Sequence, residues 1–195
     1  SCFTGRVVVI TGAASGIGRA LAQLLAARGA RLALSDINAE GLRETLNSLS
    51  PVGEARTYLV DASKRDAVFA HADAVQRDFG TAHFVINNAG GNDYKPFLEV
   101  SAQEFRHHFD WNTTSAFLLS RIATPALLAA GGGAILNISS GAGHIGIRGM
   151  LSYCVAKAGL DHLTRSLGEE LAPKIRVNGL ALGAIMTPAL QHTFD

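Results

Sequence analysis

The chain has 195 residues, with 17 lysines and arginines against 16 acidic residues and a formal net charge of +1. This balance, with basic residues spread along the chain, argues against a nucleic-acid partner, and no apolar run is long enough to span a bilayer. Charged residues make up 17% of a chain that is 48% hydrophobic, so we expect apolar surface to be buried between subunits as well as in the core.

In chain order, short apolar runs alternate with longer amphipathic patterns. The first run places Val7, Val8, Val9 and Ile10 in succession, which is typical of a strand buried on both faces. Strands are expected at residues 6–11, 31–36, 57–60, 83–87, 134–139 and 175–181, and helices at 16–28, 39–49, 64–79, 101–130 and 152–171, the fourth helix being interrupted at Pro125. Such alternation predicts a single domain over residues 1–195, a doubly wound parallel sheet of the Rossmann-like type in three α/β/α layers. Ligands of such sheets bind where the strands end.

A glycine-rich segment, Thr11–Gly18, joins the first strand to the first helix. Its glycines stand at Gly12, Gly16 and Gly18, a Gly-x-x-x-Gly-x-Gly spacing that differs from the general dinucleotide fingerprint. Glycine lets the backbone approach a pyrophosphate closely, and a helix N-terminus offers N–H donors to it. We therefore expect a phosphate-binding loop; the alternative is a tight turn without a ligand.

An acidic residue, Asp36, ends the second strand. A carboxylate there can accept hydrogen bonds from the adenosine ribose hydroxyls and repel a 2′-phosphate, so NAD is expected to be preferred over NADP. Ser15 and Ile37 supply no cation for that phosphate, and Arg19 is the nearest basic residue in the sequence. The alternative interpretation of Asp36 is a cap for the helix that follows.

A possible catalytic group lies near the fifth strand. Tyr153 and Lys157 are four residues apart on a predicted helix and so share a face. A tyrosine needs a neighbouring positive charge to act as a base near neutrality, and Lys157 supplies one. Ser140 ends the preceding strand, where its hydroxyl can hold a substrate oxygen against Tyr153. A Tyr-x-x-x-Lys pair alone is common on helices. Here it follows a glycine loop, an acidic residue after the second strand and a serine at a strand end, and this combination indicates a catalytic role.

These motifs together resemble the single-domain short-chain dehydrogenase/reductase family. The thirteen-residue separation of Ser140 from Tyr153 also matches the family. The resemblance covers nearly the whole chain, in the family's order, through the segment Thr11–Gly18, Asp61, the run Asn87-Asn88-Ala89-Gly90, Asn112, Ser140, Tyr153 and Lys157.

The resemblance implies an NAD-dependent oxidoreductase that moves a hydride between the cofactor and a secondary alcohol or ketone. Tyr153 would exchange the proton, Lys157 would lower the pKa of that tyrosine and bind the nicotinamide ribose, and Ser140 would orient the substrate oxygen. Asn112 would hold a water that links Lys157 to solvent. Contacts to the cofactor are expected from Gly12, Ser15, Gly16, Ile17, Gly18, Asp36, Ile37, Asp61, Ala62, Asn88, Ala89, Gly90, Tyr153, Lys157, Ile185 and Thr187, and contacts to the substrate from Ser140, Tyr153, Ala142 and His144.

The sequence departs from the family pattern in two ways. Leu182-Gly183 stands where the family usually has Pro-Gly after the sixth strand. Family members also continue through a substrate lid and a seventh strand, whereas the sequence ends at Asp195. We expect these residues to belong to a longer chain, or a partner subunit to cover the open edge. The helices at 101–130 and 152–171 would form the main contact of a homodimer or homotetramer, as the resemblance implies.

Two other functions compete with this prediction. The chain could be a dinucleotide-binding module without turnover, acting as a sensor or an assembly partner. An epimerase or dehydratase of the same superfamily fits less well, because those proteins tend towards another glycine spacing and a larger C-terminal domain. No metal is expected, since the histidines and the two cysteines stand in no ligand pattern. Sparse thiols also predict a reducing, cytoplasmic location.

Overall fold

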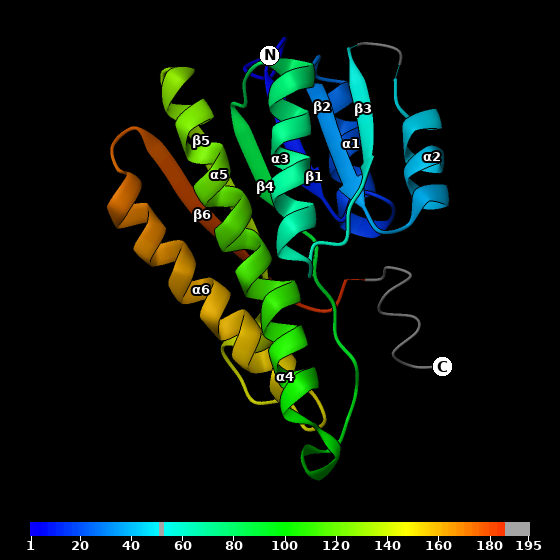
Figure 1. Cartoon of the computed structure of the whole chain (residues 1–195), viewed down its shortest axis with the longest axis vertical. Coiled ribbons are helices and arrows are strands. Elements are labelled where there is room, and N and C mark those ends of the chain that lie inside the picture. Colours follow the sequence, from blue (N-terminus) through cyan, green and yellow to red (C-terminus); the bar gives the residue numbers. More distant parts are fainter. Residues whose placement is uncertain (51–52, 186–195) are drawn as a thin grey trace.

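The computed structural model describes residues 1–50 and 53–185 and shows a parallel six-stranded sheet between two layers of helices (Figure 1). The strand order is β3-β2-β1-β4-β5-β6, the doubly wound arrangement expected from the sequence. The strands are β1 (Val7–Thr11), β2 (Arg31–Asp36), β3 (Ala55–Leu59), β4 (Phe84–Asn87), β5 (Gly133–Ser140) and β6 (Ile175–Leu182). The helices are α1 (Gly16–Ala26), α2 (Ala39–Asn47), α3 (Arg65–Phe79), α4 (Ala102–Phe109), α5 (Ser115–Ala129) and α6 (Leu151–Leu171).

Strand β1 explains why the first apolar run is continuous. Val7 and Val9 belong to the core between the sheet and helices α3 and α5, which face the viewer in Figure 1. Val8 and Ile10 belong to the opposite core, against α1 and α2. All four side chains are at most 2% exposed, so both faces of the strand must be apolar.

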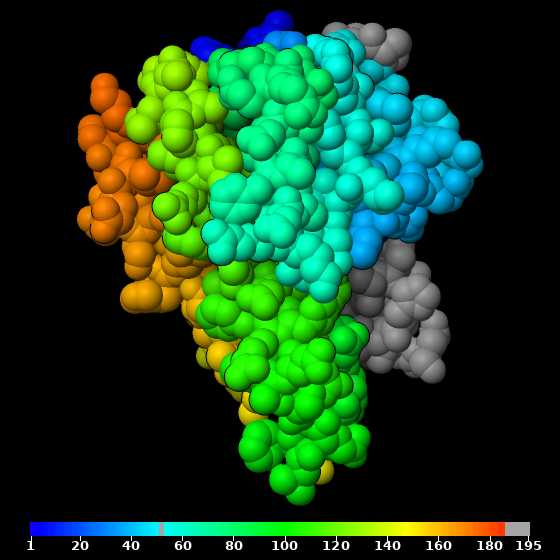
Figure 2. Space-filling model, viewed as in Figure 1, coloured from blue at the N-terminus to red at the C-terminus, as the bar shows by residue number. Residues whose placement is uncertain are grey.

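The topology gathers the strand ends at one edge of the sheet. Chain crossovers change direction between β1 and β4, which lie side by side, and this is the switch point at which such sheets bind ligands. Helix α4 and the segment before it extend beyond this edge (Figure 1) and form a narrow lobe in the space-filling view (Figure 2). Within the described residues, no helix is long and apolar enough to cross a membrane.

The long helix expected at 101–130 is divided, but the predicted position of the division at Pro125 was wrong. Pro125 lies inside α5. Its missing N–H leaves the carbonyl of Arg121 without a helical partner, and both residues are exposed, so water can satisfy that carbonyl. The division is instead a π-helical turn, Asp110–Thr114, between α4 and α5. Turns of this kind are frequent at functional sites.

Side chains stabilise this π-helical turn. The amide of Asn112 donates a 3.0 Å hydrogen bond to the carbonyl of His108, and the hydroxyl of Ser115 donates one of 2.7 Å to the carbonyl of Trp111. The hydroxyl of Thr113 donates across to the carbonyl of Ala156 on α6 at 2.6 Å. The turn is therefore fixed both within its own helix and against α6.

Candidate active site

The loop between β1 and α1 is built for close backbone contact. Gly12 has a φ of +65°, in the left-handed region that favours glycine. A Cβ at Gly18 would lie 2.0 Å from the carbonyl oxygen of Gly12, so a side chain there is excluded. Ser15 is the N-cap of α1 but makes no side-chain capping bond. The first N–H groups of the helix, which have no intrahelical acceptor, are thus left available to an anion.

The residues after β4 hold this loop in place. The hydroxyl oxygen of Thr11 accepts hydrogen bonds of 3.0 Å from the backbone N–H groups of Asn88 and Ala89. The side-chain amide of Asn88 donates to the carbonyls of Thr11 and Gly12, at 3.0 and 2.9 Å. The Asn88 side chain therefore stabilises the glycine loop by hydrogen bonding to its backbone.

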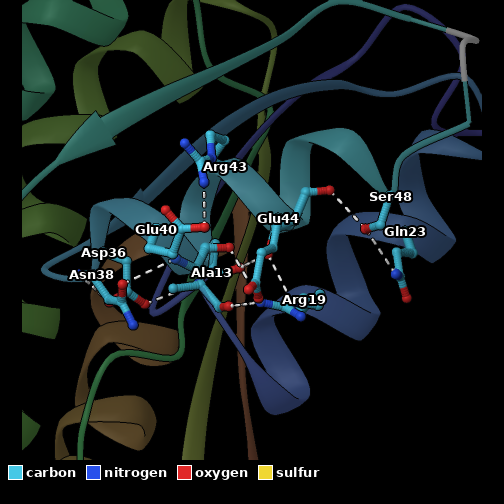
Figure 3. A network of polar contacts seen from close by, with 12 residues as sticks. Ala13, Arg19, Gln23, Asp36, Asn38, Glu40, Arg43, Glu44 and Ser48 are labelled. Atoms are coloured by element: carbon cyan, nitrogen blue, oxygen red, sulfur yellow. Dashed lines mark hydrogen bonds and ion pairs between the residues drawn. The ribbon is translucent and has the colours of Figure 1, made fainter.

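Asp36 also supports the loop from β2. One carboxylate oxygen accepts a 2.9 Å hydrogen bond from the N–H of Ala14, and the other accepts one of 3.0 Å from the N–H of Asn38 (Figure 3). The cap of α2 is Asn38, whose side chain accepts from the N–H of Gly41 at 3.0 Å. The alternative of Asp36 as the helix cap was therefore wrong.

Arg19 is engaged on the flank of α2 (Figure 3). Its guanidinium donates to the hydroxyl of Thr45 at 2.9 Å, to the carboxylate of Glu44 at 2.8 Å and to the carbonyl of Ala14. The hydroxyl of Thr45 in turn donates to the carbonyl of Ala13 at 2.9 Å. Arg19 thus ties the loop to α2 through its Nε and Nη2 nitrogens.

The predicted adenine contacts lie beside Asp36. The N–H of Val60 donates to the carbonyl of Asp36 at 2.8 Å, which brings the end of β3 to the end of β2. One carboxylate oxygen of Asp61 accepts from the N–H and the hydroxyl of Ser63, at 2.9 and 2.7 Å. Ala62 lies between them. Ile37, directly after β2, is 67% exposed, so an apolar surface borders this edge.

The predicted catalytic side chains converge where β5 meets α6. Ser140 ends β5, and Tyr153 and Lys157 occupy the first two turns of α6. The ammonium nitrogen of Lys157 lies 5.6 Å from the centre of the Tyr153 ring. It donates a 2.9 Å hydrogen bond to the carbonyl of Ile138 on β5, and the residue is 4% exposed. The three groups therefore share one site.

Burial controls the charge of this site. It raises the pKa of the Tyr153 phenol, and the Ser140 hydroxyl partly opposes that shift. It lowers the pKa of Lys157 to about 8, against an opposing effect of the Asp161 carboxylate. The expected lowering of the tyrosine pKa is thus not achieved by the residues around it, because desolvation outweighs the other contributions.

Asn112 and Gly90 lie against Lys157. The Asn112 side chain is 1% exposed; its oxygen accepts from the N–H of Gly91 at 3.1 Å, and its amide donates to the Gly91 carbonyl at 3.0 Å. A Cβ at Gly90 would come 2.6 Å from the Asn112 side-chain oxygen and 3.2 Å from the lysine nitrogen. Glycine at this position therefore lets the two side chains approach each other.

The two remaining predicted substrate residues follow Ser140. The hydroxyl oxygen of Ser140 accepts a 3.2 Å hydrogen bond from the N–H of Ala142, which is buried in the 3₁₀ turn Gly141–Gly143. His144 follows that turn, and its Nε2 lies 3.4 Å from a carboxylate oxygen of Asp161. Ile185 is 45% exposed, and Thr187 lies outside the described residues.

A buried polar network beneath the site was missed in the sequence. Asn87 and Asn137 are paired in register on β4 and β5, and the amide of Asn87 donates to the side-chain oxygen of Asn137 at 2.8 Å. Asn87 also donates to Ser120 on α5, and Asn137 donates to Thr164 on α6. These bonds fix both helices to the sheet. The available signal was an asparagine within each of two largely apolar strands.

Comparison with known proteins agrees with this geometry. A profile of the short chain dehydrogenase family matches residues 6–195. The 7alpha-hydroxysteroid dehydrogenase of Escherichia coli (strain K12) is 37% identical over 189 residues, which cover 96% of this chain and 74% of that protein. The cyclohexanol dehydrogenase of Acinetobacter sp. (strain SE19) is 36% identical over 191 residues, or 96% of this chain and 76% of that protein.

Solved structures give the same result. A 7α-hydroxysteroid dehydrogenase with NADH and 7-oxo glycochenodeoxycholic acid has a TM-score of 0.93 at 36% identity, covering 97% of this chain and 75% of that one. A levodione reductase has a TM-score of 0.93 at 34% identity, covering 98% and 76%. The chain belongs to the short chain dehydrogenase family, a family of oxidoreductases that bind nicotinamide dinucleotides and include dehydrogenases of alcohols.

Proposed function

We propose that this protein transfers a hydride between NAD(H) and a secondary alcohol or ketone, with Tyr153 as the acid/base. The observation that carries the proposal is the convergence of Ser140, Tyr153 and Lys157 at the end of β5. This group lies at the same sheet edge as the glycine loop. A pure binding module has no use for such a set, so turnover is favoured over the sensor alternative.

The residues at the sheet edge suit a dinucleotide. The close approach of Gly18 to Gly12 leaves no room for a side chain at Gly18, and the uncapped start of α1 offers N–H donors to a pyrophosphate. Asp36 ends β2 at the distance along the chain where a ribose-binding carboxylate is expected. Asp61, Ala62, Asn88, Ala89, Gly90 and Ile185 border the same edge, and we propose all of them as cofactor contacts.

The chemistry divides between the bound cofactor and the protein. NAD supplies the hydride acceptor for oxidation of the alcohol carbon. The ionised Tyr153 accepts the hydroxyl proton of the alcohol, and the Ser140 hydroxyl donates a hydrogen bond to the same substrate oxygen. The ammonium of Lys157 stabilises the phenolate, and the positive charge of the oxidised nicotinamide adds to it. This second positive charge would favour the phenolate and so lower the pKa of Tyr153, which burial within the protein alone raises.

We further propose that NAD is preferred over NADP. The Asp36 carboxylate would repel a 2′-phosphate at the end of β2. Arg19, the cation that could have attracted this phosphate, is held by Glu44, Thr45 and Ala14. The engaged state of Arg19 strengthens the preference expected from Asp36.

We also propose that the protein forms a homodimer or homotetramer through α5 and α6. Large apolar side chains are exposed on both helices, among them Phe117 at 38% and Val155 at 42%. The low charged fraction of the chain agrees with buried surface between subunits. The cytoplasmic location expected from the two cysteines, which are both free in the structure, stays a prediction.

One measurement separates an enzyme from a binding module. The protein is mixed with NAD and a panel of secondary alcohols, and the absorbance of reduced cofactor is followed. We expect reduction with at least one alcohol. A protein that binds NAD but reduces it with no alcohol, and binds NADH but oxidises it with no ketone, would instead be a sensor or assembly module.

A further inference from the structure

A buried carboxylate lies beneath the proposed active site. Asp161 follows Lys157 by one turn of α6, and its side chain is 12% exposed. Its oxygen Oδ2 is buried, and among the described residues no hydrogen-bond partner reaches it. A carboxylate withdrawn from water destabilises a fold unless charge is placed beside it. A positively charged group is therefore expected close to the Asp161 carboxylate.

Two basic groups face this carboxylate. Nε2 of His144 lies 3.4 Å from Oδ2, and the Lys157 ammonium is close enough for Asp161 to favour its protonated form. His144 comes from the segment after β5, whereas Lys157 comes from α6 itself. Asp161 therefore contacts the segment that follows Ser140 and shares α6 with the lysine of the site.

The backbone of that turn fits tightly over Asp161. A Cβ at Gly143 would lie 2.5 Å from Oδ2 of Asp161 and 3.0 Å from the carbonyl carbon of Lys157. The turn and the helix thus meet backbone to backbone. The hydroxyl oxygen of Ser140 accepts from the N–H of Ala142 in the same turn, so movement of the turn would move this hydroxyl.

We propose that Asp161 is a positioning residue whose carboxylate, paired with His144, holds the turn after Ser140 against the helix that carries Tyr153 and Lys157. The inference rests on the proposed function, because it concerns the geometry of the same reaction. It also gives His144 a new role. The imidazole supports the turn from the side of α6, in place of the substrate contact expected from the sequence.

The first test removes the charge of Asp161 and keeps its shape. We expect Asp161→Asn to lower kcat about 10- to 100-fold, since small displacements of an orienting group have effects of this size. The dissociation constant of NADH should stay at the native value, and circular dichroism should show an intact fold. Glu169→Gln is the matched control, because Glu169 is an exposed carboxylate on the same helix, and it should behave as the native protein does. A native kcat in Asp161→Asn would overturn the proposal.

The second test does not depend on turnover. Arg148 is exposed in the segment after the turn, so the rate of trypsin cleavage there, identified by fragment mass, reports how firmly the segment is held. We expect faster cleavage in Asp161→Asn and in His144→Gln, and no further increase when the two are combined, because both changes break one pair. Cleavage of Asp161→Asn at the rate of Glu169→Gln, or fully additive effects in the double variant, would contradict the pairing.

These two tests separate the two proposals. If the native protein oxidises no alcohol but the proteolysis pattern appears, the proposed function fails and the support of the turn stands. If the native protein turns over but Asp161→Asn matches it in kcat and in cleavage, the positioning role fails and the function stands.

Discussion

The ammonium of Lys157 donates a 2.9 Å hydrogen bond to the backbone carbonyl of Ile138, in the interior between α6 and β5. The residue is 4% exposed, and burial lowers its pKa from 10.5 to about 8. Because the pKa is lower in the folded protein than in the unfolded chain, the unfolded chain binds more protons between these two values. The contribution of Lys157 to the free energy of unfolding is therefore complete above about pH 10.5, and it is lost as the pH falls through about 8.

Replacement of Lys157 is therefore expected to stabilise the fold while it removes activity. At pH 7 the buried ammonium costs on the order of 3 kcal/mol, from which the lost bond to Ile138 must be subtracted. Lys157→Met should raise the melting temperature at pH 7, and the gain should shrink as the pH approaches 10. Thermal unfolding across this pH range checks it. A Lys157→Met protein less stable than the native one at pH 7 would contradict the expectation.

Tyr153→Phe removes the proposed proton carrier and keeps the ring in its place. We expect turnover to fall by roughly 10²–10⁴-fold, the range attributed to general acid/base catalysis. Cofactor binding should be retained, because the ring still packs beside Lys157. Steady-state kinetics and NADH binding measured on the same sample test this. Near-native turnover in the variant would exclude Tyr153 from the role.

The Asp36 carboxylate carries a negative charge and also accepts a hydrogen bond from the glycine loop. Two substitutions separate the effect of the charge from the effect of the hydrogen bond. Two unit charges about 4 Å apart repel by about 1 kcal/mol in water, and by more at lower dielectric, so Asp36→Ala should narrow the preference for NAD about tenfold. Asp36→Asn should narrow it similarly while an oxygen still accepts from the N–H of Ala14. Dissociation constants of NADH and NADPH are the measurement. If the native protein binds NADP more tightly, Arg19 becomes the residue to examine.

His71 on α3 predicts loss of stability in acid. It is 3% exposed, its Nε2 has no hydrogen-bond partner among the described residues, and burial lowers its pKa from 6.5 to about 4. Its contribution is complete above pH 6.5 and is lost as the pH falls through 4, at about 1.4 kcal/mol per pH unit. His71→Phe should therefore lose less stability than the native protein between pH 6.5 and 4. Urea unfolding measures this, with the exposed His162→Gln as control; equal losses would refute the assignment.

The apolar faces of α5 and α6 predict the effect of a charge at a subunit contact. Val155 lies on α6 with 42% of its surface exposed, and a lysine there would have to be buried, without a partner, in an oligomer. We expect Val155→Lys to reduce the assembly to a smaller species without unfolding it. Light scattering gives the molecular mass, and circular dichroism is the control for folding. An unchanged mass would place the contact elsewhere.

The sequence predicted the sheet because its signals are local. Four consecutive apolar residues, Val7 to Ile10, require burial on both faces, and the structure places them in two cores. The break in the fourth helix was misplaced because Pro125 is the strongest local signal for one. The π-helical turn depends on contacts with Gly91 and Ala156, which are distant in the sequence.

The same distinction applies to the site. Strand-end positions such as Asp36 and Ser140 follow from topology, since the strands of a parallel sheet end at one edge. The contacts of Arg19 with α2 and of Asp161 with the segment after β5 join residues far apart in the sequence, and no local pattern predicts either contact. Gly143 illustrates what the sequence could not predict. A Cβ at this position would lie 2.5 Å from Oδ2 of Asp161, and only the structure shows this contact.

The turn Asp110–Thr114 has a consequence for how the chain can change in length. A π turn holds one residue more than a regular α turn, so deletion of a single residue there would let α4 and α5 join as one uninterrupted helix. Every residue on one side would then rotate by about 100° relative to the other. Asn112 would leave Gly91, and Thr113 would leave Ala156. One deletion would thus give a shorter and more regular helix, and it would disrupt the proposed active site.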